Sequence, residues 1–461
     1  MDRALKALLT LVAALGAGVS GWAMIALHPA VPVALMAAAA VGLFLVSSPL
    51  AMLVGFMGVL FVRPAEFVPA LEPLMLGKLT MLGAVAYFGI TKLIRREMSL
   101  TSSGLNPFML WLAVAAAISG VLGTNPAMST ARFTEVFVKI LALYLLIVNL
   151  ANTPKRAVTF QVCLMALVVF IAGYTIYMKY TSDALVEGSR AAGIGMLGDP
   201  NDTALTILMA TPFAVAAALD ARGLARAGFM AAAFILLAGI ISTQSRGGIL
   251  GLGAGLFFVL RGRIRSRAVR FVLVGTTLLG LLVAAGIGKR QGLDNGGKLD
   301  ESAEGRLIAW KAGMGMFRAH PLLGVGYETF GDNFPMYAEA LPFDKHSMTA
   351  HNSFVLCIAE TGLFGTIPFL VLFAGAGLIG LRLAKSAEHT PPSVERAMLQ
   401  SYVGCLAAVT VSAFFLSQTW MWFIHILFAQ AAGLGRAYEI PFSATGWLRA
   451  WLTRRPLALA P

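Results

Sequence analysis

Long apolar runs recur along this chain, and they restrict its fold more than any other feature of the sequence. Of its 461 residues, 58% are hydrophobic and 12% are charged. Many of the runs approach the ~20 residues that a helix needs to cross a bilayer. Lipid offers no hydrogen-bond partner to an open backbone, so such runs cross it as helices. We therefore predict an all-α polytopic membrane protein.

We expect about 12 transmembrane helices, within a range of about 12 to 14 that depends on the weakest pair of runs. That pair spans 31–62 and is interrupted only by a short Ser-Ser-Pro break. The first run follows Arg3 and Lys6, and it is too long for a signal-peptide core, so we expect it to be the first span. The predicted segments are 5–28, 32–47, 49–63, 78–94, 106–123, 132–151, 157–178, 201–219, 227–243, 246–262, 269–288, 351–383, 397–416 and 418–436.

Basic residues gather in alternate connections between the runs, and this alternation predicts the orientation. Cytoplasmic loops are enriched in Lys and Arg, so we expect the N-terminus inside. The net charge of +13 and the Arg-rich turn 261–270 then follow from topology, and no nucleic acid partner is needed. The other inside connections carry Lys92, Arg95 and Arg96, Lys155 and Arg156, Arg222 and Arg226, Arg382, Lys385 and Arg396, and Arg449, Arg454 and Arg455.

The same orientation places one large polar segment, 289–350, on the outer face. The outer loop 179–199 and the short turns at 243–247 and near Gln418 fall on that face too. The predicted domains are an N-terminal transmembrane bundle, a large outer loop, C-terminal transmembrane helices and a cytoplasmic tail. Their bounds are 1–288, 289–350, 351–436 and 437–461.

Few polar residues interrupt the apolar runs. Arg132, Glu135 and Lys139 are spaced to pair with one another on one helix face, and lining a substrate groove is the alternative. The odd number of cysteines and their apolar surroundings indicate neither a disulfide framework nor a metal site. They are Cys163, Cys357 and Cys405. A phosphate-binding loop motif is also absent from the sequence, so we expect no cofactor and a substrate that carries its own energy.

Arg246 lies in STQSRGGILGLG, between two apolar runs with hardly any loop. A charge at the hydrocarbon boundary costs free energy unless it is paired or faces water. It either extends to the interface or binds an anion. Gly247 and Gly248 favour anion binding, because they allow close backbone approach at a helix start. The planar guanidinium also suits phosphate.

Arg190 lies in the outer loop EGSRAAGIGMLGDPND, either as a surface residue or as a second anion ligand. The end of this loop predicts a helix start, with Asp199 as N-cap, Pro200 in the first position and Asp202 in the first turn. A metal held by the two aspartates is the alternative, but capping already accounts for both residues.

Apolar residues recur at helical spacing across 304–319 and predict an amphipathic helix that ends before His320. They are Leu307, Trp310, Met314 and Phe317. We expect this apolar face to pack on the membrane bundle. Arg306 lies near the helix N-terminus, where a cation opposes the helix dipole, and this favours a ligand or ion-pair role. The glycines at 324 and 326 indicate a turn.

His351 and Asn352 stand where the polar segment meets the next apolar run. A lone histidine at a membrane boundary often has a structural role. This one opens a helix beside a charged loop, on the face that also holds the candidate arginines. An imidazole accepts a proton near neutral pH, so His351 is our candidate base.

Four signatures occur in an order that resembles one family of membrane enzymes. They are GDPND, QSRGG, the block EGRLIAWKAGMGMFRAHPLLGVGYETF, and HNSFVLCIAETGLFG. In the last, His351-Asn352 precedes Gly362 and Gly365 in a His-Asn, Gly-x-x-Gly pattern. Together they are similar to the O-antigen ligase and O-antigen polymerase superfamily of bacterial inner-membrane glycan transferases, over roughly 130–380.

The resemblance implies a GT-C-like fold with its active site facing the periplasm. It implies a glycan donor on undecaprenyl diphosphate and, for a ligase, lipid A–core oligosaccharide as acceptor. His351 would be the catalytic base, and Arg246 and Arg306 would bind the diphosphate and assist the reaction. Arg190 and Asn352 would be further substrate ligands. The expected transfer is direct and inverting, with neither metal nor cofactor.

O-antigen ligase is the function that we expect first. A polysaccharide polymerase or a protein O-oligosaccharyltransferase would use the same donor and the same residues with a different acceptor. A membrane transporter is the alternative from another class. Transporters carry ionisable sites near the bilayer midplane, whereas the charges here gather mostly at one face.

Overall fold

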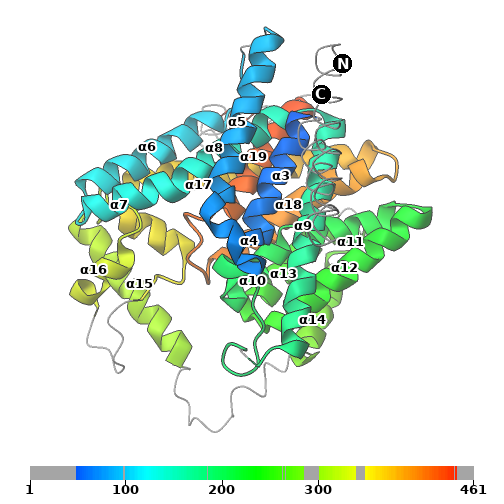
Figure 1. The fold of residues 1–461 in the computed structure, drawn as a ribbon. Helices are drawn as coiled ribbons and strands as arrows, with labels where there is room; N and C mark the ends of the chain where they lie inside the picture. The colour runs from blue at the N-terminus through cyan, green and yellow to red at the C-terminus, as the bar shows by residue number, and fades with distance from the viewer. Residues whose placement is uncertain are drawn as a thin grey trace, which may run out of the picture.

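The computed structural model describes residues 48–96, 99–183, 185–261, 263–264, 266–284, 301–338, 348–440 and 442–443 (Figure 1). Over these ranges the regular structure is helical, and the only β pairing is an isolated bridge between Val186 and Arg190. The all-α prediction is therefore confirmed for this part of the chain. The predicted spans 5–28 and 32–47 lie outside the described residues.

The N-terminal helices follow the predicted apolar runs closely. They are α3 (Pro49–Val62), α4 (Pro64–Phe67), η1 (Pro69–Leu74), α5 (Leu76–Ile94), α6 (Asn106–Leu122), α7 (Pro126–Arg132), α8 (Val138–Leu150) and α9 (Pro154–Thr181). A π-helical turn, η2 (Phe133–Phe137), joins α7 to α8, so the span predicted at 132–151 begins earlier and is longer.

One predicted span, 201–219, is broken in the structure into α10 (Pro200–Leu208) and α11 (Thr211–Asp220). Pro212 explains the break, because it has no N–H to donate to Leu208 and its ring would clash with that carbonyl. The later helices are η3 (Gly195–Leu197), α12 (Gly223–Thr243), α13 (Arg246–Arg261), α14 (Arg267–Ala284), α15 (Glu301–Ala319), α16 (Phe330–Tyr337), α17 (Ser353–Ser386), η5 (Ala387–His389), α18 (Val394–Ala413) and α19 (Trp422–Ala437).

Six stretches of the described chain are long and apolar enough to cross a membrane. They are Leu71–Ile94, Pro126–Leu150, Pro154–Thr181, Pro200–Asp220, Gly223–Thr243 and Ser353–His389. The apolar helices α3 and α6 are shorter than these. A multi-helix membrane protein is therefore supported, and the count of about 12 spans stays a prediction.

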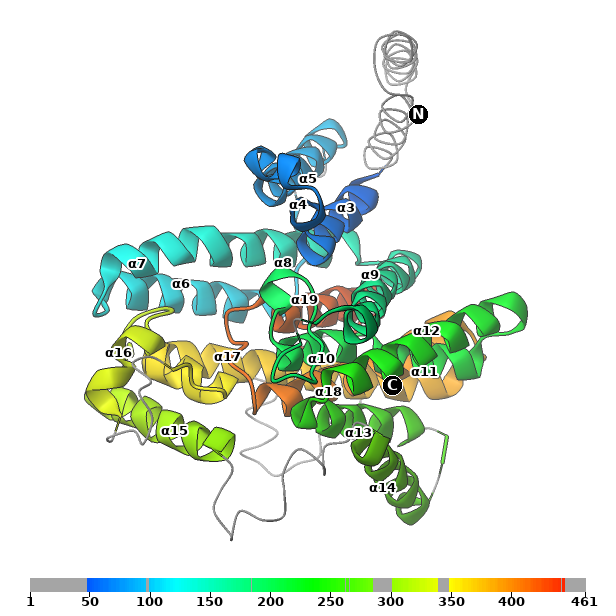
Figure 2. The same ribbon diagram turned by 60° about the horizontal axis from the view of Figure 1, so that its bottom comes forward.

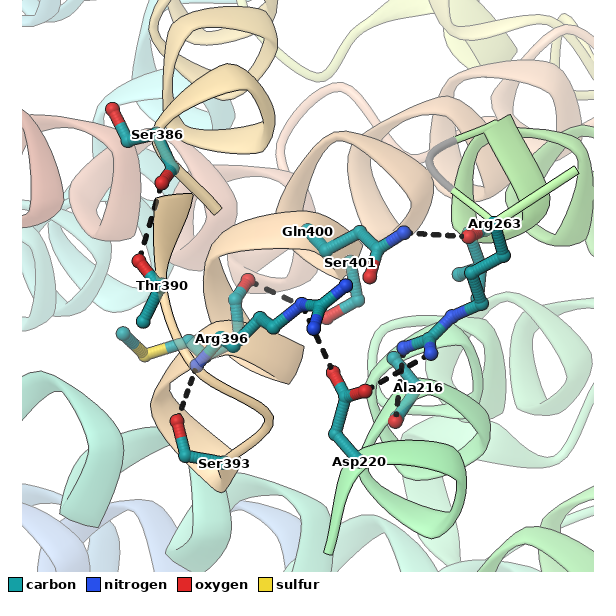
Figure 3. A network of polar contacts seen from close by, with 11 residues as sticks. Ala216, Asp220, Arg263, Ser386, Thr390, Ser393, Arg396, Gln400 and Ser401 are labelled. Atoms are coloured by element: carbon teal, nitrogen blue, oxygen red, sulfur yellow. Dashed lines mark hydrogen bonds and ion pairs between the residues drawn. The ribbon is translucent and has the colours of Figure 1, made fainter. Parts of the chain in front are cut away.

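Three of the turns that we placed inside, those after α11, α13 and α17, meet at one end of the bundle. Asp220, at the end of α11, forms ion pairs with Arg263 at 2.9 Å and Arg396 at 3.9 Å (Figure 3). We call these three residues the inner clamp. The turns that we placed outside meet at the opposite end, which we call the outer end after the predicted orientation. In both ribbon views α15 and α16 lie at the far end of the long helices from the α11–α12 turn (Figures 1 and 2).

Helix α17 is kinked at Gly362, whose backbone has φ 57° and ψ −156°. The kink frees backbone groups, and the segment 320–326 pairs with them. Val325 N–H donates to Ala359 O at 3.0 Å, and Leu363 N–H donates to Pro321 O at 2.9 Å. A Cβ at position 362 would lie 2.4 Å from the carbonyl carbon of Leu322. Glycine is therefore required here by both conformation and space.

The expected amphipathic helix is present as α15 and ends before His320, but the predicted apolar face is not its most buried one. Leu307 is 46% exposed, and Trp310, Met314 and Phe317 are half-buried. The buried positions are Gly305, Ala309, Ala312, Gly313 and Met316. A Cβ at Gly313 would lie 2.6 Å from a methyl carbon of Val355. Small residues let the helix backbone approach α17 closely, so the buried face follows them and not the bulky stripe.

Candidate active site

The turn between α18 and α19, residues 414–421, joins the segments that carry the predicted site residues. We call it the Gln418 turn. Phe415 lies against Gly247: a Cβ added to the glycine would be 3.4 Å from the Phe415 Cβ. The Ser417 Oγ accepts the His351 N–H at 2.8 Å, and the Gln418 amide donates to Asp202 Oδ1 at 2.7 Å. Residues far apart in sequence are thereby gathered at the outer end.

His351 is held by its backbone just before α17. Its φ of 46° is left-handed, a conformation that few side chains adopt without surrounding support. On its C-terminal side, the Ser353 Oγ donates to Leu416 O at 2.6 Å and accepts the Gln418 N–H at 2.9 Å. The Gln418 turn therefore fixes the backbone on both sides of this half-buried histidine.

Asn352 is the N-cap of α17. Its Oδ1 accepts the N–H groups of Phe354 at 2.9 Å and Val355 at 3.1 Å. Both lone pairs of this oxygen are therefore engaged in capping. The predicted helix start is confirmed, and a substrate contact by Asn352 would have to use its amide nitrogen.

Arg190 is buried, with 8% of its surface exposed. Its guanidinium donates to Thr243 O at 3.2 Å and to Asn201 Oδ1 at 2.7 Å, and it lies 3.5 Å from Glu187. Burial lowers the pKa of Arg190; Asp199 opposes this change and Arg246 adds to it. The group stays charged at neutral pH, and its positive charge lies close to that of Arg246.

Arg246 is exposed at the first position of α13. Ser245 caps this helix by accepting the Gly248 N–H at 3.1 Å, and it donates to Asn201 Oδ1 at 2.8 Å. Asn201 thus binds both the Arg190 side chain and the residue before Arg246. A Cβ at Gly248 would lie 2.7 Å from Ala204 Cβ, so this glycine permits close packing of α13 against α10, and anion binding at the helix start stays a prediction.

The loop before α10 ends as predicted. Asp199 caps α10 by accepting the Asn201 N–H at 2.6 Å. Asp202 does more than occupy the first turn, because its carboxylate accepts the hydrogen bond from Gln418. It therefore cross-links the arginine-bearing loop to the turn that supports His351.

Arg306 lies half-buried in the second turn of α15. A Cβ at the neighbouring Gly305 would lie 3.2 Å from the Met348 methyl carbon. This turn of α15 therefore runs beside the segment that leads to His351. Arg306 comes from a different element than the two other arginines: Arg190 lies in the loop before α10, and Arg246 lies at the start of α13.

A cavity of about 210 Å³ opens beside Thr349 and Ser417. Two carboxylates that we did not predict from the sequence, Glu328 and Glu360, line it. Burial raises the pKa of Glu328, one of its lining residues, and Arg132 opposes this change. Arg132, which we expected to pair with Glu135, instead donates to the backbone oxygen of Glu328. The alternative, that Arg132 lines a groove, describes it better.

Glu360, on α17, also lines this cavity and is 2% exposed. Its carboxylate accepts the Phe330 N–H at 2.8 Å and the Trp420 indole N–H at 2.5 Å. It therefore joins the start of α16 to the Gln418 turn. A lone carboxylate inside an apolar run is costly and often functional, and this signal could have identified Glu360 from the sequence.

Residues 231–370 match the model of the family described as O-Antigen ligase, Wzy_C. This segment contains Arg246, Arg306, His351 and Asn352. Arg190 and the GDPND signature precede it, so the match is narrower than the 130–380 that the motifs suggested.

The chain is also 26% identical over 178 residues to "Exopolysaccharide production protein ExoQ" of Rhizobium meliloti (strain 1021). The alignment covers 36% of this chain and 40% of that relative. The family match and this distant relative agree with the four signatures. The two comparisons therefore support the O-antigen ligase and polymerase superfamily for this chain.

Proposed function

We propose that this protein is an O-antigen ligase. It transfers a glycan from undecaprenyl diphosphate to lipid A–core oligosaccharide at the periplasmic face of the bacterial inner membrane. The observation that carries the proposal is the hydrogen-bonded network of the outer end. Through Asn201, Asp202 and the Gln418 turn, this network connects the candidate base His351 with the segments that carry Arg190 and Arg246.

The donor half of the reaction uses the arginines. As the bond from the anomeric carbon to the diphosphate breaks, its electron pair leaves with the diphosphate, and negative charge builds on that group. Preorganised cations stabilise such charge strongly where water is scarce. Exposed Arg246 contacts the diphosphate in this proposal, and Arg306 approaches it from α15. Buried Arg190 lies close to Arg246 and adds positive charge to the site.

The acceptor half uses His351. The imidazole takes the proton from the acceptor hydroxyl while the hydroxyl oxygen forms the new bond to the anomeric carbon. Attack opposite the diphosphate inverts the configuration. The cavity that Glu328 and Trp420 line lies next to His351, because Thr349 and Ser417 line it too. Its polar and aromatic walls suit a sugar.

A second candidate is a polymerase, which would add the glycan to another lipid-linked glycan. The name of the Rhizobium relative, an exopolysaccharide production protein, favours this alternative. A protein O-oligosaccharyltransferase would differ only in using a protein hydroxyl. All three proposals share the donor and the residues above.

The test is a transfer assay with purified protein and purified lipid-linked donor. One reaction receives lipid A–core oligosaccharide, another receives a second lipid-linked glycan, and a third receives neither. We expect a new product in the first reaction alone. Product in the second alone would replace ligase by polymerase. Intact donor in all three, with donor movement across vesicles, would favour the transporter.

A further inference from the structure

A second cavity, of about 440 Å³, lies at the inner end, among α13, α17 and α18. Three of its lining residues are cations, Arg261, Arg382 and Lys385, and one is a carboxylate, Glu388. Arg261 and Lys385 are exposed. From the sequence we expected these residues only to set the orientation in the membrane, which does not require them to converge on a cavity. Their convergence favours an anionic ligand.

A buried acceptor also lines this cavity. Gln400 is 4% exposed, and its amide nitrogen donates to Val259 O at 3.0 Å. Its carbonyl oxygen is buried and has no hydrogen-bond partner among the described residues. Figure 3 shows Gln400 beside the inner clamp, next to Arg396 and Ser401. A buried acceptor without a donor is unfavourable, so a ligand that brings a hydroxyl to Gln400 would be stabilised.

An apolar track leads away from the cavity along α17. Leu381 lines the cavity, and exposed Leu370 lies about three turns away on the same face of the helix. From Leu370 to Leu381 the helix rises about 16 Å at about 1.5 Å per residue. This length is close to half of the ~30 Å hydrocarbon core, which is one leaflet. The track therefore fits one acyl chain.

We propose that this cavity binds the headgroup of phosphatidylglycerol from the inner leaflet. The phosphodiester contacts Arg261 and Lys385, and a glycerol hydroxyl donates to the Gln400 carbonyl oxygen. One acyl chain lies along the exposed face of α17. Basic pockets between transmembrane helices are established sites for anionic headgroups. The site lies at the opposite end of α13 from Arg246, and its occupancy does not depend on the proposed transfer reaction.

The experiment is native mass spectrometry of the full chain. The protein is mixed with defined lipids in detergent, and the lipids that it retains are measured after the detergent is removed. Arg261→Gln/Lys385→Gln removes two cations of the cavity. Arg222→Gln/Arg226→Gln is the matched control, since it removes two exposed cations of another turn that we place inside. We expect the first variant to retain about tenfold less phosphatidylglycerol than wild type, and the control to stay within about twofold.

The remaining arms separate the chemistry of the ligand. Wild-type protein should retain phosphatidylglycerol over phosphatidylethanolamine, because the cavity carries an excess of positive charge. Inorganic phosphate at millimolar concentration should leave the lipid bound, because it lacks the acyl chain. Equal loss in both double variants would overturn the proposal. Equal retention of the two lipids, or displacement by phosphate, would overturn it too.

Discussion

The two ends of the helix bundle bind their arginine side chains through different kinds of partner. At the inner end, Arg263 and Arg396 share the carboxylate of Asp220, whose side chain is 3% exposed. At the outer end, buried Arg190 is held mainly by neutral groups, the Thr243 carbonyl and the Asn201 amide, and its carboxylate partner Glu187 is 55% exposed. The inner clamp therefore pairs its arginines with a buried carboxylate, whereas the outer end holds a buried arginine mainly through neutral groups.

This difference separates a structural from a functional use of one residue type. Breaking a buried ion pair is strongly destabilising, because it leaves an uncompensated charge. A cation held by dipoles is preorganised for an incoming anion, and removing it costs binding or catalysis more than folding. The inner clamp should therefore respond to mutation in stability, and the outer arginines should respond in transfer rate.

Among the variants that test this comparison, the largest effect is expected for Arg246→Ala, which should reduce transfer by about 10²–10³, the scale for losing one charge-stabilising donor. The transfer rate of Arg246→Lys should lie between those of wild type and Arg246→Ala, because lysine keeps the charge and loses the planar guanidinium. The thermal midpoint of the detergent-solubilised protein should barely change, since Arg246 is exposed. Full activity of Arg246→Ala would show that the diphosphate assignment is wrong.

Asp220→Ala tests the other end. It leaves Arg263 and Arg396 without their shared carboxylate, and we expect a loss of about 3 kcal/mol in the free energy of unfolding. Transfer per folded molecule should be unchanged. Asp332→Ala, which removes an exposed carboxylate on α16, is the control and should leave the thermal midpoint unaltered. A stable Asp220→Ala with impaired chemistry would reverse the comparison.

Gly362→Ala tests whether the kink of α17 positions the outer end. The left-handed φ and the nearby Leu322 backbone should make alanine cost about 1–3 kcal/mol, and both stability and transfer should fall. Gly173→Ala is the matched control, because a Cβ there meets no atom within 4 Å. Should the two variants have equal thermal midpoints, the kink would not be a structural requirement.

The smallest effect is expected from metal removal. The outer loops show no cluster of carboxylates or histidines at ligand spacing in the sequence, so we predict metal-free transfer. Excess chelator should leave the wild-type rate within about twofold. Loss of activity in chelator, restored by one divalent cation, would contradict direct transfer by His351 and the arginines.

Local signals in the sequence predicted the helix ends well. Asp199 caps α10 as predicted, and α17 begins beside His351 as predicted, with Asn352 as its cap. Pro212 could have predicted the break between α10 and α11, and its effect was missed because the surrounding run is uniformly apolar. Such features depend on a few neighbouring residues and need no tertiary contacts.

The candidate site was predictable only in its separate parts. The bond from Gln418 to Asp202 joins residues 216 positions apart, and no local pattern reports such a partner. The buried face of α15 includes Gly313, where α17 approaches closely, and Gly305, which lies against Met348. Periodicity of large apolar residues does not register that kind of packing.

The central claim is that the outer end is the reacting site and that His351 is its base. It is tested most directly by the transfer rate of His351→Ala beside His320→Ala, an exposed histidine at the end of α15. We predict that turnover falls by about 10²–10⁴ for His351→Ala, with donor binding retained, and that His320→Ala stays near wild type. Wild-type turnover of His351→Ala would contradict the account.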